Sequence, residues 1–205
     1  MHIGLDFDNT IVSYDALFHK VALEGGWITN EVPVSKVSVR DHLHSKGQEP
    51  IWTEMQGYVY GARMDEAVAY PSVLQCLTWA REQRIPVSIV SHKTRHPFSG
   101  KQYDLHQSAR HWIELYLTDA TGPLVIPECI YFEITKDSKV KRIADIGCTV
   151  YVDDLPEILL APEFPPSTNK ILFDPDHHHH AQDLSRASHW DDIHHRLESQ
   201  WQASA

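Results

Sequence analysis

Two of the close acidic pairs in this 205-residue sequence are Asp6 with Asp8 and Asp153 with Asp154. Each pair follows a short apolar run, so several carboxylates would gather at the ends of buried segments. That arrangement costs free energy unless a cation lies between the charges. Carboxylate oxygens are hard ligands that suit Mg²⁺. The sequence therefore predicts a magnesium site with these four residues as candidate ligands.

Asp6 and Asp8 are two residues apart, and such residues point to the same side of an extended strand. One carboxylate can attack phosphorus and form an aspartyl-phosphate when a metal screens its charge. The second can protonate the leaving oxygen and then activate water. The Ser91 hydroxyl and a lysine would hold the other phosphoryl oxygens, because positioning and charge stabilisation dominate phosphoryl transfer. These residue types predict phosphoryl chemistry, with Asp6 and Asp8 as the catalytic candidates.

Short apolar strands alternate with amphipathic helices along most of the chain. The expected strands cover residues 2–7, 86–91, 129–134, 149–152 and 170–173. Helices with one apolar face are expected after Pro71, over 102–117, after a cap at Asp137 or Ser138, and from Trp190. This alternation predicts an α/β fold with a parallel sheet that helices cover on both sides. Such sheets bind ligands at the carboxyl ends of their strands, where all the polar residues above are found.

Residues 15–68 break this alternation, since they are long, contain glycine and proline and show mixed helical patterning. We interpret them as a cap inserted into a core of residues 1–14 and 69–205. Substrate choice is expected in the cap, because a cap can close over the site and exclude water. Its cations are candidate contacts to a phosphate or sugar: Arg40, His42, His44, Lys46 and Arg63. Its aromatic residues are interpreted first as the cap's own core and second as a stacking surface for a base: Trp27, Trp52, Tyr58 and Tyr60.

Taken in order, four features resemble the motifs of the haloacid dehalogenase (HAD) superfamily: DFDNT at 6–10, a strand ending at Ser91, a lysine near a helix start, and VDD at 152–154. The resemblance covers residues 1–12 and about 70–174. It implies a three-layer, Rossmann-like core with a small, mainly helical cap. It also implies a Mg²⁺-dependent enzyme in which Asp6 is the nucleophile and a metal ligand. Asp8 would then be the acid/base and would bind the metal through its backbone carbonyl.

Three details refine what this resemblance implies. The second aspartate, Asp8, is absent from the dehalogenases and replaced in the phosphonate-cleaving branch, so its presence favours a phosphate ester. The double aspartate resembles deoxyribonucleotidase-like members, with Asp154 aligned as the direct metal ligand and Asp153 acting through water. Among the lysines of one helix start, Lys139 resembles the third-motif lysine best and Lys136 second, with Lys141 also present.

The expected function is therefore Mg²⁺-dependent hydrolysis of a small phosphate monoester, a nucleotide or a sugar phosphate, through an aspartyl-phosphate. Two alternatives stay open: a phosphotransferase that uses the same intermediate, and a non-catalytic module that binds a phosphorylated metabolite. The double aspartate favours nucleotides only weakly.

Composition excludes several other classes of protein. Lys+Arg 18 against Asp+Glu 28 gives a formal net charge of −10, which argues against nucleic-acid partners. The absence of an apolar run of about 20 residues argues against a membrane partner. The acidic start also lacks a signal-peptide pattern, so we expect a cytoplasmic protein.

Cysteines and histidines are the remaining reactive side chains. The cysteines Cys76, Cys129 and Cys148 are interpreted as reduced core residues. Histidines concentrate between His177 and His195, and we interpret this segment as a solvated loop rather than a transition-metal site.

Overall fold

The computed structural model describes residues 1–179 and 183–203, and the chain divides into two compact units. The first unit comprises residues 1–11, 69–92 and 117–205, and the second comprises 12–68 and 93–116. All of the predicted cap, 15–68, lies in the second unit. That unit also contains 93–116, which the sequence analysis assigned to the core.

A parallel sheet forms the centre of the first unit. Within the described residues it has six strands in the order β10-β9-β8-β1-β4-β7, and each neighbouring pair is parallel. The strands are β1 (Ile3–Leu5), β4 (Val87–His92), β7 (Ile130–Glu133), β8 (Val150–Asp153), β9 (Asn169–Phe173) and β10 (Ser185–Ala187). This confirms the predicted α/β class. The sequence pattern missed β10, a three-residue strand of which only Ala187 is buried.

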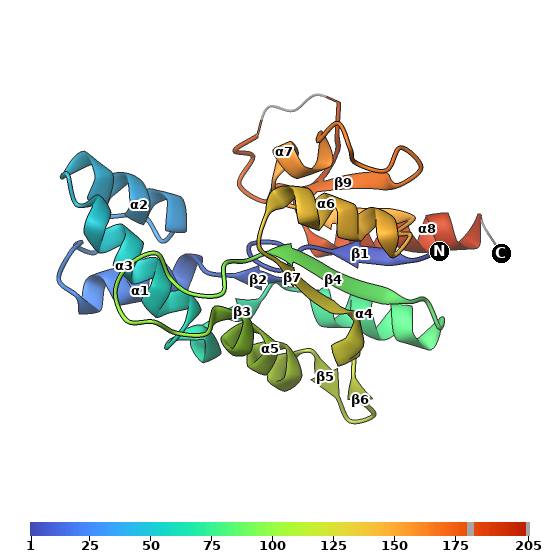
Figure 1. Cartoon of the computed structure of the whole chain (residues 1–205), viewed down its shortest axis with the longest axis horizontal. Coiled ribbons are helices and arrows are strands. Elements are labelled where there is room, and N and C mark those ends of the chain that lie inside the picture. The colour runs from blue at the N-terminus through green and yellow to red at the C-terminus, as the bar shows by residue number, and fades with distance from the viewer. Residues whose placement is uncertain (180–182, 204–205) are drawn as a thin grey trace. The chain divides into compact units, whose positions relative to one another are not determined.

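Helices cover both faces of this sheet, as Figure 1 shows for α6 and α7 on one face and α4 and α8 on the other. Their bounds are α4 (Val73–Glu82), α6 (Lys136–Asp145), α7 (Pro156–Leu159) and α8 (Trp190–Gln202). Short elements join them: η2 (Pro127–Cys129) and the antiparallel pair β5 (Thr118–Asp119) and β6 (Gly122–Pro123). None of the helices in the described ranges has both the length and the apolar character needed to cross a bilayer.

The predicted N-cap residue of helix α6 is wrong. Thr135, and neither Asp137 nor Ser138, is the N-cap residue, because its backbone is extended and its hydroxyl accepts a hydrogen bond from the Ser138 N–H at 3.1 Å. Ser138 returns the bond, since its Oγ accepts from the Thr135 N–H at 3.2 Å. This capping box fixes where α6 begins, and with it the phase that turns Lys139 toward the sheet.

The second unit is mainly helical. It contains β2 (Val12–Ser13), α1 (Asp15–Glu24), α2 (Lys36–Ser45), α3 (Glu49–Tyr60), η1 (Met64–Glu66) and α5 (Leu105–Tyr116), and β2 pairs with β3 (Val68–Ala69). Aromatic rings fill its interior: Phe18 lies 5.0 Å from Trp52 and 5.6 Å from Tyr60, measured between ring centroids. Trp52 is buried, so the core interpretation of the cap aromatics is correct for this residue.

The three cysteines differ in exposure. Cys76 and Cys148 are buried as predicted, whereas Cys129 is half-buried and therefore only partly a core residue. Burial raises the pKa of the Cys76 and Cys148 thiols to about 12.

Because the thiolate is the reactive form, we expect iodoacetamide at pH 8 to alkylate Cys129 about tenfold faster than Cys76 and Cys148 in the folded protein. Mass spectrometry of digested time points measures this, and equal rates at the three sites would contradict it.

Candidate active site

Two carboxylates far apart in the sequence meet at the carboxyl ends of neighbouring strands. Leu5 of β1 pairs with Val152 of β8, so the next residues, Asp6 and Asp153, are neighbours across the sheet. The Asp6 N–H donates to the Val152 carbonyl at 2.9 Å and extends the pairing by one residue. Parallel pairing in this register therefore brings the first and last predicted motifs together.

Lys139 of α6 lies between these carboxylates. Its Nζ is 2.6 Å from Asp6 Oδ1 and 2.7 Å from Asp153 Oδ2, and the lysine side chain is 1% exposed. Burial alone would lower the pKa of Lys139, but the Asp153 and Asp6 carboxylates raise it above its usual range. The lysine is therefore an ammonium that compensates two buried negative charges.

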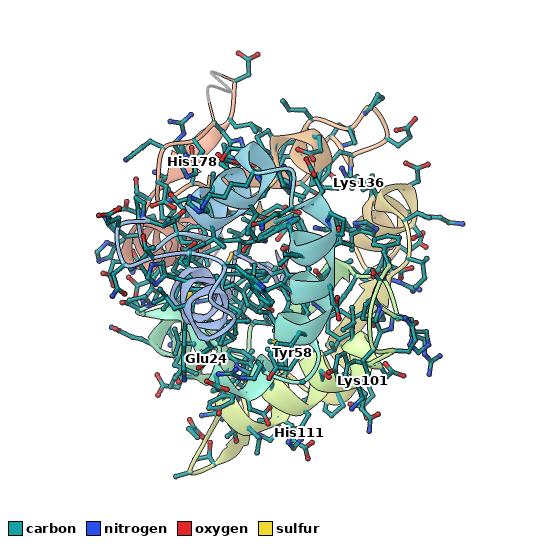
Figure 2. All side chains as sticks on the ribbon, turned by 90° about the vertical axis from the view of Figure 1, so that its left-hand side faces the viewer. Glu24, Tyr58, Lys101, His111, Lys136 and His178 are labelled. Atoms are coloured by element: carbon teal, nitrogen blue, oxygen red, sulfur yellow. The ribbon has the colours of Figure 1, made fainter. Side chains whose placement is uncertain are left out.

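Lys136, the other lysine candidate, is placed differently. Its Nζ donates to Glu157 Oε1 at 3.0 Å, and both side chains are about half exposed. Figure 2 shows Lys136 at the surface. Of the two candidates, the structure brings only Lys139 into contact with the predicted catalytic aspartate.

Asp153 is fully buried at the end of β8. Burial raises the pKa of its carboxyl, and the ammonium of Lys139 opposes this effect. Asp153 Oδ1 also accepts a hydrogen bond from the Leu155 N–H at 2.9 Å, so the side chain is held from two directions.

Asp6, Asp153 and Asp154 form a group that fits a divalent cation. Each offers one carboxylate oxygen, and these oxygens lie within 4.8 Å of one another. Asp154 is half-buried and accepts a hydrogen bond from Asn9 Nδ2 at 3.3 Å. Three carboxylates and the ammonium of Lys139 leave a formal charge of −2, and oxygen donors of this kind suit Mg²⁺. Asp8 is half-buried in the loop after β1, and its carboxylate is outside this group.

We expect Mg²⁺ to stabilise the folded protein through this group. At a concentration 100 times its Kd, a ligand that binds only the folded state adds about 2.7 kcal/mol, which raises the Tm of a chain of this size by about 5–10 °C. The D154N variant should lose most of this shift, because one ligand charge is gone. D137N, which removes an exposed carboxylate of the same unit, should retain it. Equal shifts in D154N and the parent in thermal unfolding would show that Mg²⁺ binds elsewhere.

Ser91 lies near the carboxyl end of β4, the strand next to β1 on the side away from β8. It is 1% exposed and pairs with Phe132 of β7. The structure thus places Ser91 on the same sheet edge as the aspartates, where the sequence expected it. Its role toward phosphate stays a prediction.

Two of the charged residues predicted in the cap, Arg63 and Arg40, bind carboxylates of the second unit. Arg63 donates to Glu24 Oε2 at 2.6 Å and also pairs with Glu66, and Arg40 pairs with its neighbour Asp41. These guanidinium groups already have carboxylate partners. Their contact with a substrate therefore stays a prediction.

Two of the cap aromatics line a cavity. Trp27 and Tyr58 border a space of about 190 Å³ in the second unit, together with Ile51, Glu54, Met55, Lys101 and Tyr103. Figure 2 shows Tyr58 and Lys101 on the same face of that unit. Tyr58 is exposed and Trp27 is half-buried, so stacking of a base on these two rings stays a prediction.

Asp174, which sequence reasoning missed, organises the start of the histidine-rich segment. It follows β9, is 3% exposed, and accepts hydrogen bonds from the backbone N–H groups of His178 at 2.9 Å and His179 at 3.1 Å. The signal was present, since an acid directly follows the predicted strand 170–173. Among the described residues no group of three or more metal-ligating side chains includes a histidine, and His180 lies outside the described residues. The solvated-loop prediction is wrong for the end of the segment, because His194 is buried on α8.

Comparison with known proteins identifies the fold. No protein-family model matches the sequence, and no curated protein matches it. A HAD-superfamily hydrolase from Geobacter sulfurreducens superposes with a TM-score of 0.54 at 9% identity, covering 96% of this chain and 95% of its own. The putative HAD-hydrolase YfnB from Bacillus subtilis, crystallised with magnesium, gives 0.52 at 12% identity over 96% and 97%. The L-2-haloacid dehalogenase RSc1362 gives 0.52 at 9% identity over 96% and 98%.

These matches extend over nearly the whole of each chain. The chain therefore has the fold of the HAD superfamily, with a Rossmann-like core, as the motifs predicted. At such low identity the likeness establishes the fold alone.

Proposed function

We propose that the protein hydrolyses a small phosphate monoester with the help of Mg²⁺, using Asp6 as the nucleophile. The observation that supports this most is the buried contact of Asp6 with Lys139, beside Asp153 and Asp154. A carboxylate can approach an anionic phosphoryl group only where nearby cations offset the repulsion. Lys139 supplies one such charge, and the aspartate group is suited to bind another.

In the first step an oxygen of the Asp6 carboxylate forms a bond to phosphorus, and the bond from phosphorus to the ester oxygen breaks. Asp8 gives its proton to the departing alkoxide, which leaves as an alcohol. Asp6 then carries the phosphoryl group as a mixed anhydride.

In the second step Asp8, now a carboxylate, takes a proton from water while the water oxygen attacks phosphorus. The bond from phosphorus to Asp6 breaks, inorganic phosphate is released, and both aspartates return to their starting states. Asp8 follows Asp6 by two residues just after the end of β1, and both side chains are proposed to reach one phosphorus.

A bound Mg²⁺ would screen the negative charge of the phosphoryl oxygens from that of Asp6. Asp6 and Asp154 are the proposed direct ligands, together with the Asp8 backbone carbonyl. Asp153 is the proposed partner through water, because Lys139 and the Leu155 N–H already hold its side chain. Ser91 and Lys139 are proposed to position the phosphoryl oxygens.

Asp8 favours phosphate esters over the carbon–halogen bonds that RSc1362 is named for. Dehalogenation needs no acid for its halide leaving group, whereas an alkoxide needs a proton. A carboxyl group two residues after the nucleophile meets that need.

The test is release of inorganic phosphate from a panel of nucleotides and sugar phosphates, with Mg²⁺ or EDTA, and with D6N as the blank. We expect release that requires Mg²⁺ and is absent from D6N. A chloroacid substrate measured in parallel for halide release tests the dehalogenase alternative. Phosphate transfer to an added alcohol, without equal release to water, would instead indicate a phosphotransferase. Mg²⁺ binding with no turnover of any substrate would favour a binding module.

A further inference from the structure

Tyr151 joins two strands of the sheet that are not neighbours. It is fully buried in the middle of β8, and its hydroxyl donates a hydrogen bond to the Val90 carbonyl of β4. In the sheet order, β1 lies between β8 and β4. The tyrosine side chain therefore passes over β1 to reach its partner.

Gly4 makes this crossing possible. It pairs with Tyr151 in the register of β1 and β8. A Cβ atom at this position would lie 2.5 Å from Tyr151 Cδ2 and 2.5 Å from Cys148 Sγ, closer than such atoms approach. The glycine is thus required for space, because any side chain would occupy the path of the ring.

The Tyr151 ring lies on the same face of the sheet as the carboxylates of the candidate site. Tyr151 precedes Asp153 by two residues, and Gly4 precedes Asp6 by two, so strand alternation places all four on one face of the sheet. Lys139 Nζ is 5.9 Å from the centroid of the Tyr151 ring, within the range of a cation–π contact. The Tyr151 ring therefore contacts and stabilises the Lys139 ammonium.

The hydroxyl of Tyr151 acts on another part of the site. The Val90 carbonyl belongs to the same planar peptide group as the Ser91 N–H, so a bond that fixes one orients the other. Ser91 is the residue of β4 proposed to hold a phosphoryl oxygen.

We propose that Tyr151 is a positioning residue that braces the carboxyl end of β4, with Ser91, against the Asp6–Lys139–Asp153 cluster across Gly4. Its consequence for phosphate binding rests on the function proposed above. The brace itself is a property of the fold and can be measured without any ligand.

The first measurement is amide hydrogen exchange of the peptide 87–93 in the Y151F variant, which keeps the ring and removes the hydroxyl. We expect exchange at the carboxyl end of β4 to become about tenfold faster, because local opening no longer breaks this hydrogen bond. Y14F is the matched control. Tyr14 is also a buried tyrosine, but its hydroxyl contacts Met64 Sδ at 3.4 Å in the second unit. Unchanged exchange of β4 in Y151F, or an equal change in Y14F, would overturn the proposal.

The second measurement is the Kd of inorganic phosphate in the presence of Mg²⁺, by calorimetry. Y151F should bind phosphate about five- to tenfold more weakly, and Y14F should match the parent. Mg²⁺ affinity should stay within about twofold in both variants, because the aspartates are unchanged. If Y151F bound phosphate as tightly as the parent, Tyr151 would stabilise β4 without affecting phosphate binding. That result would overturn its proposed role at the site. If the parent itself binds no phosphate, the proposed function fails, and the exchange experiment still decides the brace.

Discussion

Replacement of Asp6 by asparagine is expected to lower phosphate release by about 10⁴-fold or more, which is the usual scale for loss of a nucleophile. An amide oxygen is a much weaker nucleophile toward phosphorus than a carboxylate oxygen. Asparagine has nearly the same shape, and Lys139 keeps Asp153 as its charged partner at 2.7 Å. The fold should therefore persist, with a circular dichroism spectrum like that of the parent.

The control for this experiment is D137N, which makes the same chemical change on an exposed residue of α6. It should turn over substrate at the parental rate. D6N is assayed under single-turnover conditions with excess enzyme, so that slow release is still detected. Hydrolysis by D6N within tenfold of the parent would show that another group attacks phosphorus.

Replacement of Lys139 by methionine is expected to have the largest effect on stability. It removes the ammonium between Asp6 and Asp153, whose side chains are 5% and 0% exposed, and leaves two buried carboxylates close together. Breaking a buried ion pair in this way costs about 3–5 kcal/mol. For a chain of this size the Tm should fall by about 10 °C. Urea unfolding monitored by tryptophan fluorescence measures the free energy of unfolding directly.

K136M is the matched control, because Lys136 begins the same helix and pairs with Glu157 at the surface. Exposed pairs of this kind contribute at most about 1 kcal/mol. Mg²⁺ should restore part of the stability lost in K139M, since it supplies positive charge to the same aspartates. Equal unfolding free energies for K139M and K136M would show that the buried cluster tolerates its negative charge without Lys139.

The sequence alone was sufficient to predict the strands that carry the site. Apolar runs followed by Asp6, Ser91 and Asp153 indicated buried strands with polar carboxyl ends, and the sheet has those strands in a parallel arrangement. The prediction succeeded because side-chain periodicity follows from backbone geometry, which each segment has on its own.

The choice of lysine needed the tertiary structure. Lys136, Lys139 and Lys141 share one helix start, and spacing alone left the choice among them open. The Thr135 cap and the docking of α6 on the sheet decide that Lys139 points to Asp6. A helix pattern shows which face is buried, but not which residue of another element that face meets.

The same distinction explains the residues that sequence reasoning missed. Tyr151 fits a buried strand in the sequence, and nothing local shows that its hydroxyl reaches Val90 two strands away. The amphipathic pattern of 102–117 predicted the helix that the structure has as α5 (Leu105–Tyr116), without showing that it groups with the second unit. Local pattern determines an element and its buried face, whereas strand order and register determine its partners. Strand order and register depend on contacts between residues far apart in the chain. Only the folded structure therefore shows that the Tyr151 ring contacts Lys139.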